Sequence, residues 1–209
     1  MNRCVIFGGA AIADYDRVRS AIRENDYIVC CDSGLVHAEA LGITPDLVIG
    51  DFDSHENPHL PAETIVLPRE KDDTDTAYAV KEALRRGFSD FLLAGAIGQR
   101  MDHTLVNVSL LLRLQQAGAR AVILDDYEEI SLIAPGAEAQ IGDQYPYFSL
   151  LAFDGPAEGV TITGAKYPLR DAVITAYDPY ATSNEVLSGE TAHVSVQRGS
   201  LLLIKVYGR

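Results

Sequence analysis

The residues best suited to chemistry in this 209-residue chain are aspartates that follow short apolar runs. Asp51 and Asp53 stand two positions apart in the segment Gly50–Ser54, directly after the apolar run Leu47–Ile49. Side chains at positions i and i+2 of an extended chain point to the same side, so these two carboxylates can act together. Other aspartates that follow an apolar run or begin the next helix are Asp32, Asp72, Asp73, Asp75 and Asp102.

This acidic region predicts a binding site for a divalent cation. Residues 46–75 contain nine acidic residues and two basic residues. Converging carboxylates repel one another, and a cation such as Mg²⁺, which prefers hard oxygen ligands, removes that repulsion. Because Mg²⁺ commonly bridges the phosphates of a substrate, the pattern indicates phosphate chemistry.

A second candidate site follows the apolar run Phe91–Ala94. Glycine-containing turns before a helix present backbone N–H groups that bind anions, and arginine is suited to phosphate. The segment matches neither the G-x-G-x-x-G pattern nor the G-x-x-x-x-G-K-[ST] pattern. The glycines Gly8-Gly9 after the first apolar run are equally open to a binding or a structural role. The candidate residues here are Gly95, Gly98, Arg100, Asp102, His103 and Asn107.

Structural roles compete with these chemical ones. Asp73 or Thr74 is placed to cap the helix that follows, and Asp75 would then be favoured by the helix dipole. Asp32 also fits a plain turn, and Asp102 fits a helix N-cap. The pair Asp51 and Asp53 is harder to explain structurally, so it is the strongest part of the predicted metal site.

Alternating strand-like and helix-like segments up to about residue 134 predict how these residues are positioned. Short apolar runs separated by helical spacing favour a largely parallel sheet with helices on both faces, in a Rossmann-like α/β arrangement. The carboxyl ends of parallel strands lie at one edge of the sheet, where ligands bind. The expected strands are Cys4–Phe7, Tyr27–Cys31, Leu47–Ile49, Thr64–Leu67, Phe91–Ala94, Ala121–Leu124 and Ile130–Ile133, and the expected helices are Asp14–Arg23, Leu35–Leu41, Thr74–Arg86 and Leu105–Gln116.

The rest of the chain has a different character. Short β-rich segments are separated by Gly, Pro and Asp without a helical period, which predicts a small antiparallel sandwich or barrel. We therefore expect two domains, residues 1–134 and 138–209, with a hinge at Pro135-Gly136. The expected strands of the second domain are Phe148–Phe153, Val160–Thr163, Ala172–Thr175, His193–Val196 and Leu201–Val206.

Charge and composition argue against several classes of protein. The net charge of −13 opposes binding to nucleic acid or to anionic lipid surfaces, both of which need basic patches. No apolar run approaches the ~18 residues that span a bilayer, and the first residues lack the pattern of a signal peptide. Cys4, Cys30 and Cys31 fit neither a disulfide framework nor a metal site, and predict buried thiols in a reducing cytoplasm.

These motifs together resemble the thiamin pyrophosphokinase family. Their order and spacing match over nearly the whole chain, and the combination is specific although no single motif is. Ser33 and Gln99 stand where the family often has glycine. The matching segments are Gly42–Asp46 leading to Gly50–Ser54, Lys71–Asp75, Gly95–His103 with Asn107, Lys166–Leu169 and Thr182–Glu185.

The resemblance implies an α/β nucleotide-binding domain followed by a β-sandwich, in a homodimer with thiamin bound at the subunit interface. It implies transfer of a pyrophosphoryl group from ATP to the hydroxyl group of thiamin, with Mg²⁺ and with release of AMP. The implied metal ligands are Asp51, Asp53 and Asp75. Among the implied catalytic residues, Asp32 is a further acidic residue of the site and Asp102 orients the reacting groups. The residues implied for ATP are Gly95, Gly98, Arg100, His103 and Asn107, and those implied for thiamin are Lys71, Ser183 and Asn184.

Three other functions are alternatives to the transfer of a pyrophosphoryl group to thiamin. They are a pyrophosphokinase for a pterin alcohol, a non-catalytic nucleotide or thiamin sensor, and a metal-dependent phosphohydrolase. The β-rich half with Thr182–Glu185 favours thiamin over a pterin, and the complete set of carboxylates argues against a sensor. A hydrolase would be excluded by AMP formation that depends on an acceptor. The sequence does not choose between Asp75 and Asp102 as the group that accepts the hydroxyl proton.

Overall fold

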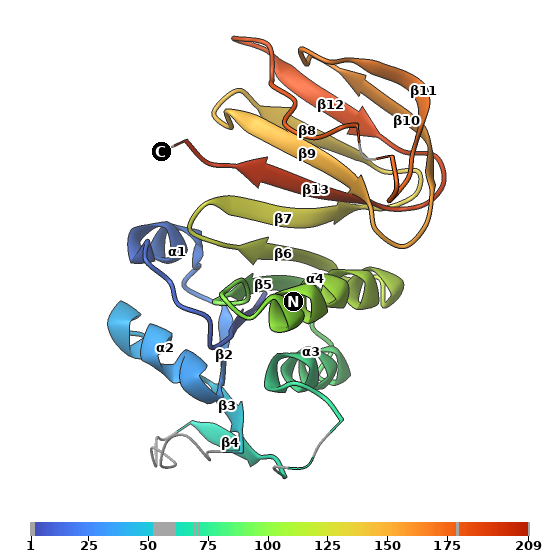
Figure 1. The fold of residues 1–209 in the computed structure, drawn as a ribbon. Coiled ribbons are helices and arrows are strands. Elements are labelled where there is room, and N and C mark those ends of the chain that lie inside the picture. The colour runs from blue at the N-terminus through green and yellow to red at the C-terminus, as the bar shows by residue number, and fades with distance from the viewer. Residues whose placement is uncertain (1–2, 52–61, 69, 71, 179, 209) are drawn as a thin grey trace. The chain divides into compact units, whose positions relative to one another are not determined.

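A computed structural model describes residues 3–51, 62–68, 70, 72–178 and 180–208 (Figure 1). The chain divides into two compact units, Met1–Asp126 and Tyr127–Arg209. The division falls before the hinge that we expected at Pro135-Gly136.

The first unit is built on a parallel sheet with the strand order β4-β3-β2-β1-β5-β6. Every residue of β1 and β3 is buried, and such strands favour a parallel sheet covered on both faces. The chain runs outward from β1 to β4, and then returns to the other side of β1 with β5. The strands are β1 (Cys4–Phe7), β2 (Tyr27–Cys31), β3 (Leu47–Gly50), β4 (Glu63–Val66), β5 (Asp90–Ala94) and β6 (Arg120–Leu124).

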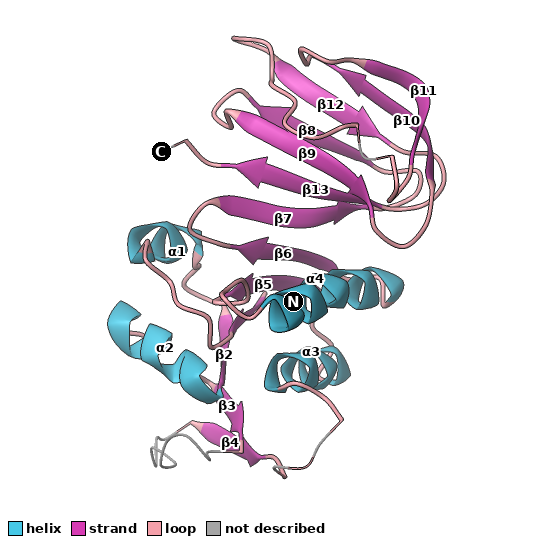
Figure 2. Cartoon of the chain, in the orientation of Figure 1, coloured by secondary structure: helices cyan, strands magenta, loops and turns pink. Residues whose placement is uncertain are grey.

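Helices cover both faces of this sheet, as predicted: α1 and α2 lie on one face and α3 and α4 on the other (Figure 2). The N-cap of α3 is Thr74, and Asp73 instead forms an ion pair with Lys81. The alternative that Asp102 caps α4 is wrong, because the helix begins earlier than expected and Asp102 lies in its first turn. The helices are α1 (Tyr15–Ala21), α2 (Leu35–Leu41), α3 (Asp75–Arg85) and α4 (Met101–Gln116), with a 3₁₀ turn at Asp32–Gly34.

The second unit is an antiparallel sandwich of two sheets, with the orders β7-β13-β9 and β11-β10-β12-β8. Side chains of both sheets meet in one core, which includes Phe148 and Leu203 from the first sheet and Ile162 and Val194 from the second. The strands are β7 (Glu128–Ile133), β8 (Glu138–Gly142), β9 (Tyr147–Ala152), β10 (Ala157–Thr163), β11 (Leu169–Ile174), β12 (Thr191–Ser195) and β13 (Leu201–Val206).

One strand lies in a different unit from the one expected. We expected Ile130–Ile133 to be the last strand of the α/β domain. The observed strand β7 pairs along its whole length with β13 in antiparallel fashion, and it contributes Ile133 to the sandwich core. An apolar run predicts a strand but does not identify the strand with which it pairs.

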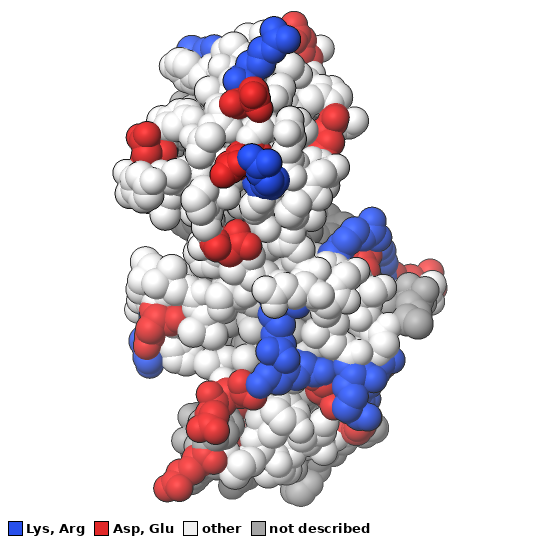
Figure 3. All heavy atoms as spheres, turned by 90° about the vertical axis from the view of Figure 1, so that its right-hand side faces the viewer, with Lys and Arg blue, Asp and Glu red and all other residues white. Residues whose placement is uncertain are grey.

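Side chains of both charges lie at the surface of the molecule (Figure 3). On the face drawn in Figure 3, Lys and Arg side chains lie beside Asp and Glu side chains. Within the described part of the chain, no helix combines the length and the apolar character that crossing a membrane requires.

Candidate active site

Two of the predicted carboxylates, Asp32 and Asp51, follow the adjacent strands β2 and β3. Asp32 follows β2 and adopts a φ of 41°, which is uncommon for a residue other than glycine and is often seen at functional sites. Gly50 ends β3 so close by that a Cβ on it would lie 3.2 Å from the Cα of Asp32. Because Cys31 and Ile49 are paired in the sheet, Asp32 and Asp51 leave adjacent strands on the same edge.

Asp75 brings a third carboxylate to this edge from the first turn of α3. Thr74 fixes that turn, because its Oγ1 accepts a hydrogen bond from the backbone N of Ala77 at 3.2 Å. Burial, with a smaller contribution from the Asp75 charge, raises the pKa of the Cys31 thiol well above its usual value. Helix α3 packs against β2, so the charge of Asp75 acts on the last residue of that strand. The Oδ1 atoms of Asp32 and Asp75 are both buried.

The chemistry of these donors fits a magnesium ion. Carboxylates from two adjacent strand ends and one helix start supply hard oxygen ligands, and their mutual repulsion favours a bound cation. Among the residues that the structure describes, no three His, Cys, Asp or Glu side chains form an assembled metal-binding group. Asp53, which the resemblance implies as a ligand, lies outside the described residues, as does Lys71.

The strand order reverses between β1 and β5, where the backbones of two glycines lie close together. Gly8 and Gly95 follow these strands, and a Cβ on Gly8 would lie 2.5 Å from the carbonyl oxygen of Gly95. Gly95 has a φ of 62°, and a Cβ on it would lie 2.6 Å from the carbonyl oxygen of Gly8, so a side chain does not fit there. In doubly wound α/β folds this crevice is where nucleotides bind.

Two polar side chains of α4 fix the loop between β5 and α4. Asn107 is buried, and its Nδ2 donates a hydrogen bond to the carbonyl oxygen of Ala96 at 2.7 Å. Thr104, which the sequence analysis missed, accepts a hydrogen bond from the backbone N of Gly98 at 3.1 Å. Asn107 therefore holds the loop that we predicted to bind ATP, with its amide N–H engaged by that loop.

Charged groups lie exposed at the start of α4. Arg100 and Asp102 form a two-bond ion pair, with Nε–Oδ1 and Nη2–Oδ2 distances of 2.9 and 2.6 Å. The hydrogen bonds from Arg100 hold the pKa of Asp102 well below its usual value, so this carboxylate stays ionised. His103 is exposed beside them. These three side chains are accessible to a ligand from solvent.

In the second unit, the structure brings together the two motifs that the resemblance singled out there. Asn184 is only 2% exposed, and its side chain accepts a hydrogen bond from the backbone N of Tyr167 and donates one to its carbonyl oxygen. Lys166 and Glu185 form an ion pair across the same contact, at 2.7 Å. Ser183 is exposed and has a φ of 54°. Asn184 therefore joins the two motifs, and Ser183 faces solvent.

The sequence analysis also missed His37 of α2, which is 2% exposed and lies against the loop that follows β1. The spacing of apolar residues in the sequence contained a signal for the burial of His37. His37 precedes the buried Leu41 by four positions, so the two share one face of the helix.

Comparison with known proteins gives matches in both units. The profile described as "Thiamin pyrophosphokinase, catalytic domain" matches residues 18–123, and "Thiamin pyrophosphokinase, vitamin B1 binding domain" matches residues 138–201. A thiamine pyrophosphokinase of Bacillus subtilis (strain 168) is 29% identical over 181 residues, which cover 83% of this chain and 84% of the relative.

Comparison with solved structures also gives matches to thiamin pyrophosphokinases. A crystal structure of thiamine pyrophosphokinase from Bacillus subtilis has a TM-score of 0.85 and 26% identity, with 100% of both chains covered. One of thiamin pyrophosphokinase from Geobacillus thermodenitrificans has a TM-score of 0.81 and 26% identity, and covers 100% of this chain and 98% of the other.

Proposed function

Because this chain belongs to the thiamin pyrophosphokinase family, we propose that it transfers the pyrophosphoryl group of ATP to the hydroxyl group of thiamin. One observation carries the proposal: the family's two domains match this chain in order, one in each unit. The catalytic-domain match contains Asp32 and Asp51, which follow adjacent strands, and Asp75, which begins α3. The binding-domain match contains Ser183.

The proposed reaction makes one bond to phosphorus and breaks another. The hydroxyl oxygen of thiamin attacks the β-phosphorus of ATP, and the bond from that phosphorus to the oxygen of the α-phosphate breaks. AMP leaves with the electron pair, and the hydroxyl proton is released. Reactions of this kind depend on positioning and electrostatics more than on covalent catalysis.

We assign the first unit to ATP and the metal ion. Asp51, Asp75 and Asp53 would hold Mg²⁺ with Asp32 beside them, and the ion would neutralise charge on the phosphates. The backbone at Gly95 and Gly98, with the exposed Arg100 and His103, would bind the phosphates.

The exposed ion pair at the start of α4 bears on which residue accepts the hydroxyl proton. Arg100 lowers the pKa of Asp102, so this carboxylate is a weak base and is better suited to orienting the hydroxyl group. Asp75, the other candidate, belongs to the carboxylates assigned to the metal ion.

Two further proposals concern the protein in the cell. We propose a homodimer with thiamin bound where the subunits meet, in which Ser183 and Lys71 contact thiamin. Sedimentation of the purified protein tests this, and a monomer at assay concentration would contradict it. We also propose a cytoplasmic location, supported by three free, buried cysteines, which suit a reducing compartment.

The proposed function is tested by a product assay. Purified protein is incubated with ATP and Mg²⁺, with and without thiamin, and the products are separated by chromatography. AMP and thiamin diphosphate should appear together, and only when both thiamin and Mg²⁺ are present. ATP consumption without thiamin would indicate a hydrolase. Turnover with a pterin alcohol but not with thiamin would also contradict the proposal.

A further inference from the structure

A buried histidine and a tyrosine hold the loop that follows β1. The Nε2 of His37 lies 2.9 Å from the carbonyl oxygen of Ala10, and its Nδ1 lies 2.8 Å from the hydroxyl oxygen of Tyr15. A carbonyl oxygen only accepts hydrogen bonds, so Nε2 carries the hydrogen. Burial lowers the pKa of His37, which favours the neutral ring. Nδ1 is then an acceptor, and the Tyr15 hydroxyl donates to it.

The same contact reaches the loop that follows β5. The backbone N of Ala10 donates a hydrogen bond to the carbonyl oxygen of Gly95 at 2.9 Å, so both polar backbone atoms of Ala10 are engaged. A Cβ on Gly95 would lie 3.1 Å from the Nε2 of His37, and a Cβ on Gly98 would lie 2.8 Å from that of Ala10. His37 therefore secures the point where the two glycine loops meet.

The far end of the β1 loop is fixed from another strand. The carboxylate of Asp126, which follows β6, accepts hydrogen bonds from the backbone N atoms of Ala13 and Asp14, the latter at 2.8 Å. Asp14 in turn caps α1. Residues 8–14 thus run between two side-chain anchors, His37 at one end and Asp126 at the other.

We propose that His37 and Tyr15 are positioning residues for ATP, which act through Ala10 to hold the loop after β1 against Gly95 and Gly98. The inference rests on the proposed function in naming ATP as the ligand. Glycines supply no side chains that could fix these loops by packing, so their shape depends on backbone hydrogen bonds. Loss of the His37 contact allows the loop to relax, and ATP binding must then restore its order.

The test compares three variants by calorimetric titration with ATP and Mg²⁺ in the absence of thiamin. His37→Leu keeps an apolar side chain of similar size but removes the donor, and we expect the Kd of ATP to rise about tenfold. His37→Gln retains an N–H donor and should recover most of that loss. Tyr15→Phe removes only the hydroxyl and should raise the Kd about threefold. In turnover assays the KM of thiamin should stay unchanged.

The matched control is His193→Leu. His193 lies in β12 of the second unit, and its Nδ1 likewise forms one hydrogen bond, with Glu138 at 2.6 Å. Its substitution should leave the Kd of ATP unchanged.

An unchanged Kd of ATP in folded His37→Leu, or an equal loss of ATP and thiamin affinity, would overturn the inference. If His37→Leu does not fold, Tyr15→Phe decides by the same criterion. A wild-type protein that binds ATP but makes no thiamin diphosphate would refute the proposed function and leave the positioning role standing. A wild-type protein that does not bind ATP would refute the inference.

Discussion

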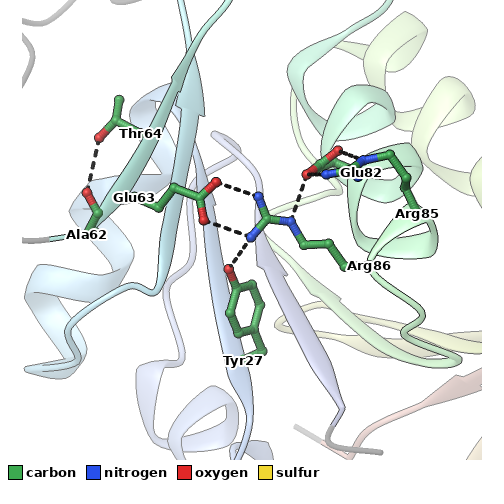
Figure 4. Close-up of polar contacts among 7 residues, drawn as sticks. All are labelled: Tyr27, Ala62, Glu63, Thr64, Glu82, Arg85 and Arg86. Carbon is green, nitrogen blue, oxygen red and sulfur yellow. Dashed lines mark hydrogen bonds and ion pairs between the residues drawn. The ribbon is translucent and has the colours of Figure 1, made fainter.

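Arg86 joins three secondary structure elements at the end of the sheet opposite the candidate active site, and its loss should destabilise the first unit. It follows α3 and bonds to the first residues of two strands (Figure 4). Its guanidinium group donates to the hydroxyl oxygen of Tyr27 at 2.8 Å, to Glu82 at 2.7 Å and to both carboxylate oxygens of Glu63.

The size of the effect follows from burial. Glu82 is 8% exposed, and a hydrogen bond between charged groups in such a place contributes about 1.5–3 kcal/mol. The bond to Tyr27 adds roughly 1 kcal/mol, whereas the pair with the exposed Glu63 adds little because solvent screens it. Arg85 still bonds to Glu82 when Arg86 is replaced, which reduces the loss. We expect Arg86→Met to lower the free energy of unfolding by about 2–3 kcal/mol.

Urea unfolding followed by circular dichroism measures this loss, and Arg85→Met is the matched control. Arg85 is the neighbouring arginine, also bonds to Glu82, but has a side chain that is 71% exposed against 21% for Arg86. We expect a clearly smaller loss for Arg85→Met. Equal losses in the two variants would refute the reasoning from burial.

The same network predicts a pH dependence. Hydrogen bonds from Arg85 and Arg86 lower the pKa of Glu82 from 4.5 to about 2. A carboxylate with a lowered pKa in the folded state stabilises the protein above its unfolded pKa, and this contribution disappears as the pH falls toward about 2. Arg86→Met should raise the pKa of Glu82, so the variant should lose less stability than the wild type over that range. A parallel loss in both proteins would contradict this.

Two further predictions separate catalysis from stability. Asp75→Asn should lower kcat/KM by about a hundredfold or more while leaving the melting temperature equal or higher, because it removes a proposed metal ligand and relieves carboxylate repulsion; full activity would contradict the assignment. Ser183→Gly should raise the KM of thiamin at unchanged stability, since a φ of 54° suits glycine. Asn184→Ala should instead lower the free energy of unfolding by about 1–3 kcal/mol, because it leaves the backbone N and carbonyl oxygen of Tyr167 without their partners. Kinetics and thermal unfolding of both variants measure this, and a raised KM of thiamin at unchanged stability in Asn184→Ala would contradict it and identify Asn184 as a thiamin contact.

Much of the fold could be predicted because its elements are bounded by clear signals. The strands β1, β2 and β13 and the helix α2 have the bounds expected from the sequence. These strands are largely apolar, with β1 wholly buried, β2 mostly buried and β13 buried in its first half, and each ends near glycine or a charged residue. The local sequence pattern is sufficient to predict the bounds of a strand where consecutive residues are buried.

The missed elements depend on contacts that local pattern does not contain. β8 was not predicted, because it lies at the edge of its sheet and only Ile141 of its residues is buried. β7 was predicted as a strand but placed in the wrong unit, since its partner β13 comes much later in the chain. Pairing between distant segments decided both cases.

The roles of side chains in the candidate site also depend on contacts that the local sequence pattern does not contain. The family resemblance implies that Asn107 contacts ATP and that Asn184 contacts thiamin. In the structure both amides bond to backbone atoms of the loops predicted to bind ATP and thiamin. A sequence does not distinguish an amide that donates to a ligand from one that donates to a nearby carbonyl group.

A buried polar side chain bonds to each of two loops at the candidate active site: His37 to the loop after β1 and Asn107 to the loop after β5. Backbone groups that are withdrawn from water need partners, and loops rich in glycine have few apolar side chains that could fix their shape. A polar side chain on a helix beside the loop meets both needs. Substitution of such a residue lowers ligand affinity although it never touches the ligand, so affinity alone does not identify a contact. Rescue by a side chain that keeps the same donor, as in His37→Gln, distinguishes the two roles.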